Sequence, residues 1–151
     1  MFVCQGNICR SPMAELIFKK MLGEKGLSGR FSVSSCATSS EEISISGVGN
    51  PVYPPARAEL KKHGIECGGK RAVQLKREDY GKYDMFVGMD SNNISNMHRI
   101  FGGDPENKIS KLMDFTSRGG DVADPWYSDR FDIAYEDIFD GCKALLEKLL
   151  K

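Results

Sequence analysis

The chain has 151 residues, and its 21 basic and 21 acidic residues give a formal net charge of zero. This length suits a single domain, residues 1–151, with a sizeable core, and the charge balance argues against a nucleic-acid-binding protein. We expect no membrane association, because no apolar stretch approaches the roughly 20 residues that cross a bilayer and no signal-peptide pattern is present. The five cysteines lack the spacing of a disulfide framework, which indicates reduced thiols in the cytoplasm.

Residues 4–11, with the sequence Cys-Gln-Gly-Asn-Ile-Cys-Arg-Ser, lie between a short apolar strand and a helix. Residues 2–3 predict the end of a buried strand, and Ser11-Pro12 predicts a helix start with Ser11 as the N-cap. Such a loop directs backbone N–H groups and the positive end of the helix dipole at one point, which favours an anion or a thiolate. The guanidinium of Arg10 can bind two phosphate oxygens at once.

Short strands alternate with helices along the rest of the chain. Hydrophobic periodicity and turn residues predict strands at residues 31–35, 84–90 and 109–113, and helices at residues 12–22, 55–63, 91–100 and 131–150. Long polar loops are expected at residues 36–55 and 118–129. This order is typical of an α/β sandwich with a mostly parallel sheet, in which ligands bind at the carboxyl ends of strands such as the one before Cys4.

The residues of the loop support phosphoryl transfer. Cys4 can attack phosphorus in line and form a phosphocysteine, while backbone N–H groups and Arg10 hold the non-bridging oxygens. Gly6 allows the backbone to approach the phosphate closely, and Asn7 tolerates a left-handed conformation. The hydroxyl of Ser11 can assist the thiolate as nucleophile and leaving group.

A leaving oxygen needs a general acid, and Asp124 is the best candidate. Pro125 restricts the backbone of Asp124 and helps to aim its carboxyl group, although an Asp-Pro pair by itself more often just opens a turn. The alternative candidates are Asp90, Asp114 and Asp121.

Three aromatic residues, Tyr53, Trp126 and Tyr127, can form the walls of a pocket for an aromatic leaving group. Ordinary packing of their loops is the equally weighted alternative.

The remaining chemistry concerns cysteines. Cys9 can form a reversible disulfide that protects Cys4 from over-oxidation, or it simply packs at the helix start. Three further cysteines are expected to pack in the interior, namely Cys36, Cys67 and Cys142. We expect no metal site, because His63 and Cys67 lack the second pair of ligands that a zinc site requires.

The loop resembles the Cys-x5-Arg-Ser loop of the low-molecular-weight protein tyrosine phosphatases. The resemblance continues through Pro12-Met13-Ala14-Glu15, Ser35, His63-Gly64-Ile65, Met89-Asp90 and Asp124-Pro125, and covers essentially the whole chain. It implies a three-layer α/β sandwich in which helices flank a four-stranded parallel sheet. The phosphate-binding loop then lies between the first strand and the first helix, and the enzyme uses neither metal nor cofactor.

The resemblance also implies an activity, the hydrolysis of phosphotyrosine in proteins or peptides. It assigns Cys4 as the nucleophile, Arg10 as the phosphate ligand and Asp124 as the general acid. The phosphate-binding loop then also includes Gln5, Gly6, Asn7, Ile8, Cys9 and Ser11. A hydrogen-bond network of Asn7, Ser11, Ser35 and His63 is implied to hold this loop, and we expect a monomer with at most weak self-association.

Two positions depart from the family pattern. Family members often carry Trp or Tyr shortly before a Val-Gly pair, whereas Val48-Gly49 here follows Ser46-Gly47 in an expected insertion, which makes Tyr53 a candidate replacement. Trp126 also stands where Tyr is common after Asp-Pro, which changes the shape of the pocket.

Three alternative functions remain open. Protein arginine phosphatases look similar but tend to carry Thr at the position of Ile8, whose bulk favours an aryl phosphate. Thioredoxin-coupled arsenate reductases share the loop but use two further cysteines on a flexible segment, and no cysteine lies between Cys67 and Cys142. The third alternative is a non-enzymatic phosphate-binding module.

Overall fold

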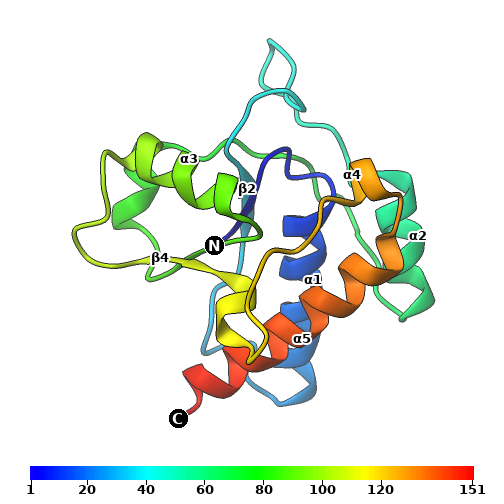
Figure 1. Ribbon diagram of the computed structural model, residues 1–151. Coiled ribbons are helices and arrows are strands. Elements are labelled where there is room, and N and C mark those ends of the chain that lie inside the picture. Colours follow the sequence, from blue (N-terminus) through cyan, green and yellow to red (C-terminus); the bar gives the residue numbers. More distant parts are fainter.

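The computed structural model describes residues 1–151 (Figure 1). A sheet of four parallel strands has the order β2-β1-β3-β4. The strands are β1 (Phe2–Cys4), β2 (Ser35–Ala37), β3 (Phe86–Gly88) and β4 (Ile109–Lys111). The α-helices are α1 (Arg10–Glu24), α2 (Pro54–Lys62), α3 (Ser91–Phe101), α4 (Pro125–Ser128) and α5 (Phe131–Leu149), and η1 (Arg77–Gly81) and η2 (Leu112–Phe115) are 3₁₀-helices. The predicted four-stranded parallel α/β fold is confirmed.

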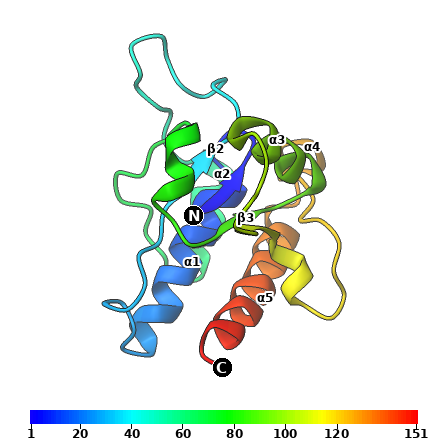
Figure 2. The ribbon, with the colours of Figure 1, turned by 90° about the vertical axis from the view of Figure 1, so that its left-hand side faces the viewer.

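The central strands are buried on both faces, and their alternate residues pack into two different hydrophobic clusters. Phe2 and Cys4 face the larger cluster, which contains residues of α1 and α5, while Val3 faces a smaller cluster with Met97 and Phe101 of α3. Figures 1 and 2 show α1 and α5 side by side on one face of the sheet. The layers are therefore helix, sheet and helix.

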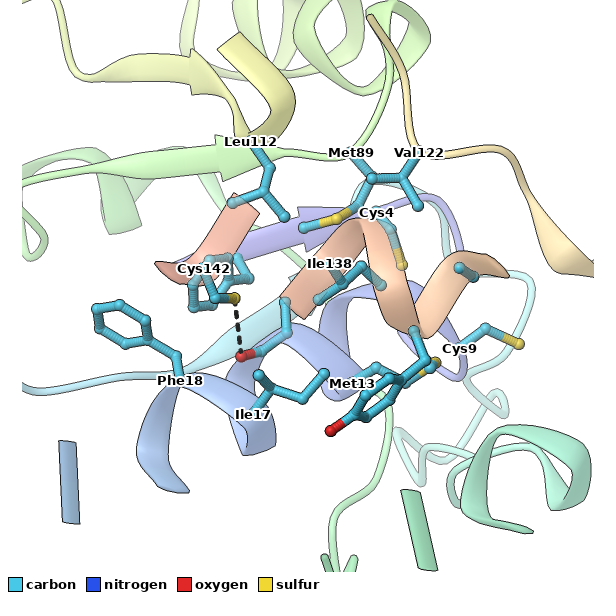
Figure 3. Packing of buried hydrophobic residues seen from close by; sticks show 14 of the residues in the cluster. Cys4, Cys9, Met13, Ile17, Phe18, Met89, Leu112, Val122, Ile138 and Cys142 are labelled. Atoms are coloured by element: carbon cyan, nitrogen blue, oxygen red, sulfur yellow. Dashed lines mark hydrogen bonds between the residues drawn. The ribbon is translucent and has the colours of Figure 1, made fainter. Parts of the chain in front are cut away.

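The larger cluster brings the first and last helices together beneath the phosphate-binding loop. Figure 3 shows Met13 and Ile17 of α1 packed near Ile138 and Cys142 of α5, and the thiol of Cys142 donates to the carbonyl oxygen of Ala14 over 3.8 Å. Since these side chains are almost fully buried, the N-terminal end of α1 has little freedom to move.

The three strands that follow β1 are shorter than predicted. The bounds predicted for the second strand, residues 31–35, are wrong, because β2 spans Ser35–Ala37. In β2, Ser35 pairs with Phe2 and Ala37 pairs with Cys4, so the short β1 selects residues 35–37 as its partner. Of residues 31–34, Phe31 and Val33 pack against the core, and both are only partly buried. The strands predicted at residues 84–90 and 109–113 keep three residues each, because the chain turns into α3 and η2.

The helix boundaries also differ in ways that affect the site. Helix α1 begins at Arg10 rather than at Pro12, and Ser11 is not the N-cap; Cys9 takes that position without a side-chain cap. Helix α2 spans Pro54–Lys62, and α4 lies inside the loop predicted at residues 118–129. None of the helices combines the length and the apolar composition that a membrane-spanning segment needs.

Candidate active site

The phosphate-binding loop, residues 4–11, surrounds a cavity of about 190 Å³ at the carboxyl end of β1. The cavity is lined by Cys4, Gln5, Gly6, Asn7, Ile8, Cys9, Arg10, Glu41, Glu42, Asp124, Trp126 and Tyr127. Residues more than 110 positions apart in the chain thus meet at one point. The position agrees with the rule that parallel α/β sheets bind ligands at the carboxyl ends of their strands.

Cys4 lies at the bottom of this loop and is almost completely buried, with 3% of its surface exposed. Its Sγ atom is 3.0 Å from the hydroxyl oxygen of Ser11 and accepts the backbone N–H of Asn7 over 3.3 Å. Because Ser11 lies in the first turn of α1 instead of capping it, its hydroxyl is free to face the sulfur. Both groups are placed to donate to a negatively charged sulfur.

The side chain of Asn7 connects the loop to two neighbouring segments. Asn7 has φ of +58°, which confirms the predicted left-handed conformation. Its amide nitrogen donates to the hydroxyls of Ser11 at 2.7 Å and Ser35 at 2.9 Å, and its Oδ1 accepts the backbone N–H of Val73 at 3.0 Å. Asn7 is 1% exposed, so water has little access to compete for these hydrogen bonds.

A buried carboxylate, Glu15, extends this network. The hydroxyl of Ser35 donates to Oε1 of Glu15 over 2.6 Å, and Lys19 and Lys70 place ammonium groups 2.7 and 3.6 Å from the same carboxylate. Burial by itself raises the pKa of Glu15, but hydrogen bonds from Lys19 and Ser35 and the charge of Lys70 lower it overall. The sequence placed Glu15 in the family motif but gave no sign of this contact, which joins residues 20 and more positions apart.

The guanidinium group of Arg10 is hydrogen-bonded to three protein groups, which fix its orientation. Its Nη1 donates to Oδ2 of Asp90 at 2.7 Å and to the carbonyl oxygen of Val122 at 2.9 Å, and its Nη2 lies 3.4 Å from Oδ2 of Asp124. Burial lowers the pKa of Arg10, but the charges of Cys4 and Asp90 raise it overall, and the group stays cationic. Of its five N–H donors, one on Nη2 and the one on Nε remain without a protein acceptor.

Among the four candidate aspartates, only Asp124 lines the cavity. It is the N-cap of α4, where its Oδ1 accepts the backbone N–H of Trp126 over 3.0 Å and Pro125 occupies the first helical position. Asp90 is bound to Arg10, Asp121 pairs with Lys111 at 2.9 Å, and Asp114 is exposed in η2.

Two of the three candidate aromatic residues border the cavity. Trp126 is 54% exposed and Tyr127 is 82% exposed, so both rings are accessible to a molecule that enters the cavity. Tyr53 does not line the cavity. Its ring packs against Trp126 with 4.9 Å between centroids, and its backbone N–H donates to the carbonyl oxygen of Ile8. Tyr53 therefore supports the wall that Trp126 forms.

The model of the family described as low molecular weight phosphotyrosine protein phosphatase matches residues 1–151. The chain belongs to this family. The protein tyrosine phosphatase YfkJ of Bacillus subtilis is 34% identical, with 100% of this chain and 95% of that protein covered. The rat low-molecular-weight phosphatase is 35% identical over 98% of this chain and 93% of its own length. The crystal structure of YfkJ superposes with a TM-score of 0.92, covering 99% of this chain and 92% of that one.

One residue that the family resemblance placed in the network lies elsewhere in this phosphatase. His63 follows the end of α2, where its Nε2 is 3.1 Å from Oε2 of Glu59 and its ring stacks on Tyr135 at 3.7 Å between centroids. The expectation that His63 belongs to the hydrogen-bond network of Asn7, Ser11 and Ser35 is therefore wrong. Glu15 and Lys70 are the charged groups that adjoin Ser35 instead.

The cavity also contains residues that the sequence did not single out. Glu41 and Glu42 lie in the long polar loop after β2 and reach the rim beside Gly6. Gly6 has little room for a side chain, because a Cβ there would lie 3.2 Å from Cγ of Glu42. The only sequence signal was an acidic pair within the long polar loop expected at residues 36–55.

The remaining cysteines differ in access to the site. Cys9 lines the cavity, and burial together with the nearby charge of Cys4 raises the pKa of its thiol to about 12. The three cysteines outside the loop, Cys36, Cys67 and Cys142, are free and buried, as expected. No group of three or more His, Cys, Asp and Glu side chains in the structure is arranged to hold a metal ion.

Glu15→Gln tests the contribution of the buried carboxylate to stability. The folded-state pKa of Glu15 is lowered, so its stabilising effect is present above the unfolded value of about 4.3 and is lost as pH falls through the folded value. We expect the variant to lose about 1–3 kcal/mol in the free energy of unfolding at pH 7, since Lys70 loses its charged partner. The measurement is urea unfolding of both proteins between pH 7 and pH 3.

The difference between parent and variant should shrink toward the acidic end of this series. An exposed control, Glu147→Gln, should change the free energy of unfolding by less than about 0.5 kcal/mol throughout. A difference for Glu15→Gln that stays constant down to pH 3 would show that its charge has no part in the effect.

Proposed function

We propose that this protein hydrolyses phosphotyrosine in proteins or peptides through a phosphocysteine intermediate. The observation that carries the proposal is the meeting of Cys4, Arg10 and Asp124 around one cavity. These residues provide a nucleophile, a fixed cation and a carboxyl group, which are the groups that the hydrolysis of a phosphomonoester requires. Membership of the tyrosine phosphatase family supports the same reaction.

In the first step, the thiolate of Cys4 attacks phosphorus. The S–P bond forms as the bond from phosphorus to the phenolic oxygen breaks, and protonated Asp124 gives its proton to that oxygen. The free N–H donors of Arg10 and the backbone N–H groups of the loop hold the three non-bridging oxygens. The bond of Arg10 to Asp90 fixes the orientation of the guanidinium before substrate binds.

In the second step, water attacks the phosphocysteine. Asp124, now a carboxylate, accepts a proton from this water as the new O–P bond forms and the S–P bond breaks. The hydroxyl of Ser11 and the N–H of Asn7 stabilise the departing thiolate of Cys4, and inorganic phosphate leaves.

The walls of the cavity support an aromatic leaving group. The side chain of Ile8 borders the cavity on the loop side, and Trp126 and Tyr127 border it beside Asp124. Aromatic side chains recognise a phenyl ring by packing and edge-to-face contact. The buried positions of Cys67 and Cys142 give no support to a relay of the arsenate-reductase type.

The activity is tested with peptides that carry phosphotyrosine, phosphoarginine or phosphoserine. We expect release of phosphate from the phosphotyrosine peptide, and a loss of this release in Cys4→Ser, which removes the nucleophile. Phosphate is measured colorimetrically in all six reactions. If the protein prefers the phosphoarginine peptide, phosphoarginine is the substrate instead of phosphotyrosine. If the parent releases no phosphate and Cys4→Ser still binds the anion, the protein is a phosphate-binding module.

Asp124→Asn tests the general acid. The amide cannot donate a proton to the leaving oxygen, so kcat for an aryl phosphate with a poor leaving group should fall by about 10²–10⁴-fold. An aryl phosphate whose leaving group needs no proton should be affected much less in the first step. Equal kcat values for parent and variant on the poor leaving group would assign the proton to another residue.

We also propose a redox role for Cys9 in the same loop. Oxidation of Cys4 by peroxide gives a sulfenic acid; the Cys9 thiol then forms an S–S bond with Cys4 as the hydroxyl leaves with the Cys9 proton as water. Peroxide-treated parent should regain activity with dithiothreitol, whereas Cys9→Ser should lose activity irreversibly. Mass spectrometry of the linked peptide is the direct measurement, and equal recovery of both proteins would contradict the role.

A cytoplasmic location and a monomeric state complete the proposal. The chemistry needs a reduced Cys4, and all five cysteines are free thiols in the structure.

A further inference from the structure

A narrow loop between β2 and α2, residues 41–50, stands beside the mouth of the cavity. Figure 1 shows this loop in cyan at the top of the molecule, and Figure 2 shows it extending from the body in a second view. Ile43 and Gly49 form an antiparallel bridge, and the N–H of Ser44 donates to the carbonyl oxygen of Val48 over 2.9 Å. The loop is therefore a small hairpin with its own hydrogen bonds.

The base of the hairpin is fixed to the rest of the protein. Arg71 donates from Nη1 to the carbonyl oxygen of Gly49 at 2.9 Å, and the N–H of Ala72 donates to the carbonyl oxygen of Asn50 at 2.9 Å. A Cβ atom on Gly49 would lie 1.9 Å from the carbonyl oxygen of Ala72, so the two backbones are in close contact. The residues at the base consequently hold a defined position relative to the phosphate-binding loop.

Two carboxylates at this base, Glu41 and Glu42, line the cavity. Oε1 of Glu41 accepts the side-chain N–H of Gln5 over 3.2 Å, and Oε2 of Glu42 accepts the side-chain N–H of Asn50 over 2.7 Å. Both partners are neutral amides. None of the ion pairs in the protein includes Glu41 or Glu42.

The charges around the cavity are thus unbalanced. Its one cationic side chain is Arg10, which is already paired with Asp90 and Asp124. An acidic residue beside the phosphorylated side chain would meet Glu41 and Glu42 at short range, where like charges repel. A lysine or arginine in the same place would find two carboxylates without a cationic partner.

We propose that Glu41 and Glu42 determine substrate specificity by selecting phosphorylated segments with basic residues next to the phosphorylated side chain. The inference rests on the proposed function, because it names the class of peptide that the same site accepts. The two carboxylates attract the flanking cation and discourage acidic flanks, while Arg10 and the loop bind the phosphate. Specificity of this kind needs both the attractive and the repulsive contact.

The test compares two peptides with the same phosphotyrosine and either lysines or glutamates on both sides of it. Affinity is measured by fluorescence polarisation with non-hydrolysable phosphonate versions of the peptides, and kcat/KM with the phosphate versions. The parent should favour the lysine peptide by about tenfold, since one exposed charge pair changes affinity by roughly 1.4- to 5-fold and several act together. The preference should decrease from 50 to 500 mM salt.

The double variant Glu41→Gln/Glu42→Gln removes both charges while keeping side chains that can accept the bonds from Gln5 and Asn50. Its affinity ratio for the two peptides should fall to within about twofold of one. The matched control Glu147→Gln, on the exposed surface of α5, should keep the preference of the parent. An equal affinity of the parent for both peptides, or a preference that persists in the double variant, would overturn the proposal.

The two readouts separate this inference from the proposed function. A parent that prefers the lysine-flanked phosphonate but releases no phosphate would contradict the hydrolase reaction and support the charge selection. A parent that hydrolyses both phosphate peptides with equal kcat/KM would support the reaction and overturn the selection.

Discussion

The phosphate-binding loop depends on the side chain of one buried residue, Asn7. Its backbone adopts a left-handed conformation, and its amide group bonds to Ser11 in α1, to Ser35 at the start of β2 and to the backbone of Val73. Three segments that are distant in sequence are thereby joined at the point where the chain leaves β1. Because Asn7 is nearly inaccessible to water, each lost bond would leave a buried polar group without a partner.

The same arrangement connects the core with the chemistry. The Ser11 hydroxyl that accepts from Asn7 also lies 3.0 Å from the sulfur of Cys4, and Ser35 passes the network on to the carboxylate of Glu15. Helix α1, which carries Ser11 and Glu15, is held by its packing against α5 (Figure 3). Preorganised donors of this kind need no rearrangement when charge develops on the sulfur.

Charge is distributed unevenly around the loop. Arg10 is buried, and its contacts with Asp90 and Asp124 orient it and balance its charge at the bottom of the cavity. Glu41 and Glu42 at the rim have only amide partners, which leaves negative charge where a bound peptide would pass. In the proposed function, the bottom of the site binds the phosphate and the rim contacts the chain that carries it.

The sequence by itself determined the class of fold and the loop that carries Cys4 and Arg10, because local signals specify them. A cysteine and an arginine within one strand–loop–helix unit must be close in space, whereas the Asp-Pro pair left Asp124 as one of four candidate aspartates until the structure placed it alone at the cavity. The short β1 limited its partner β2 to residues 35–37, which no periodicity in residues 31–35 could indicate. Tertiary structure alone decided that Glu15 joins the network while His63 stacks on Tyr135, and that Glu41 and Glu42 reach the cavity. These contacts join residues far apart in the chain, and their partners are selected by packing rather than by any local pattern.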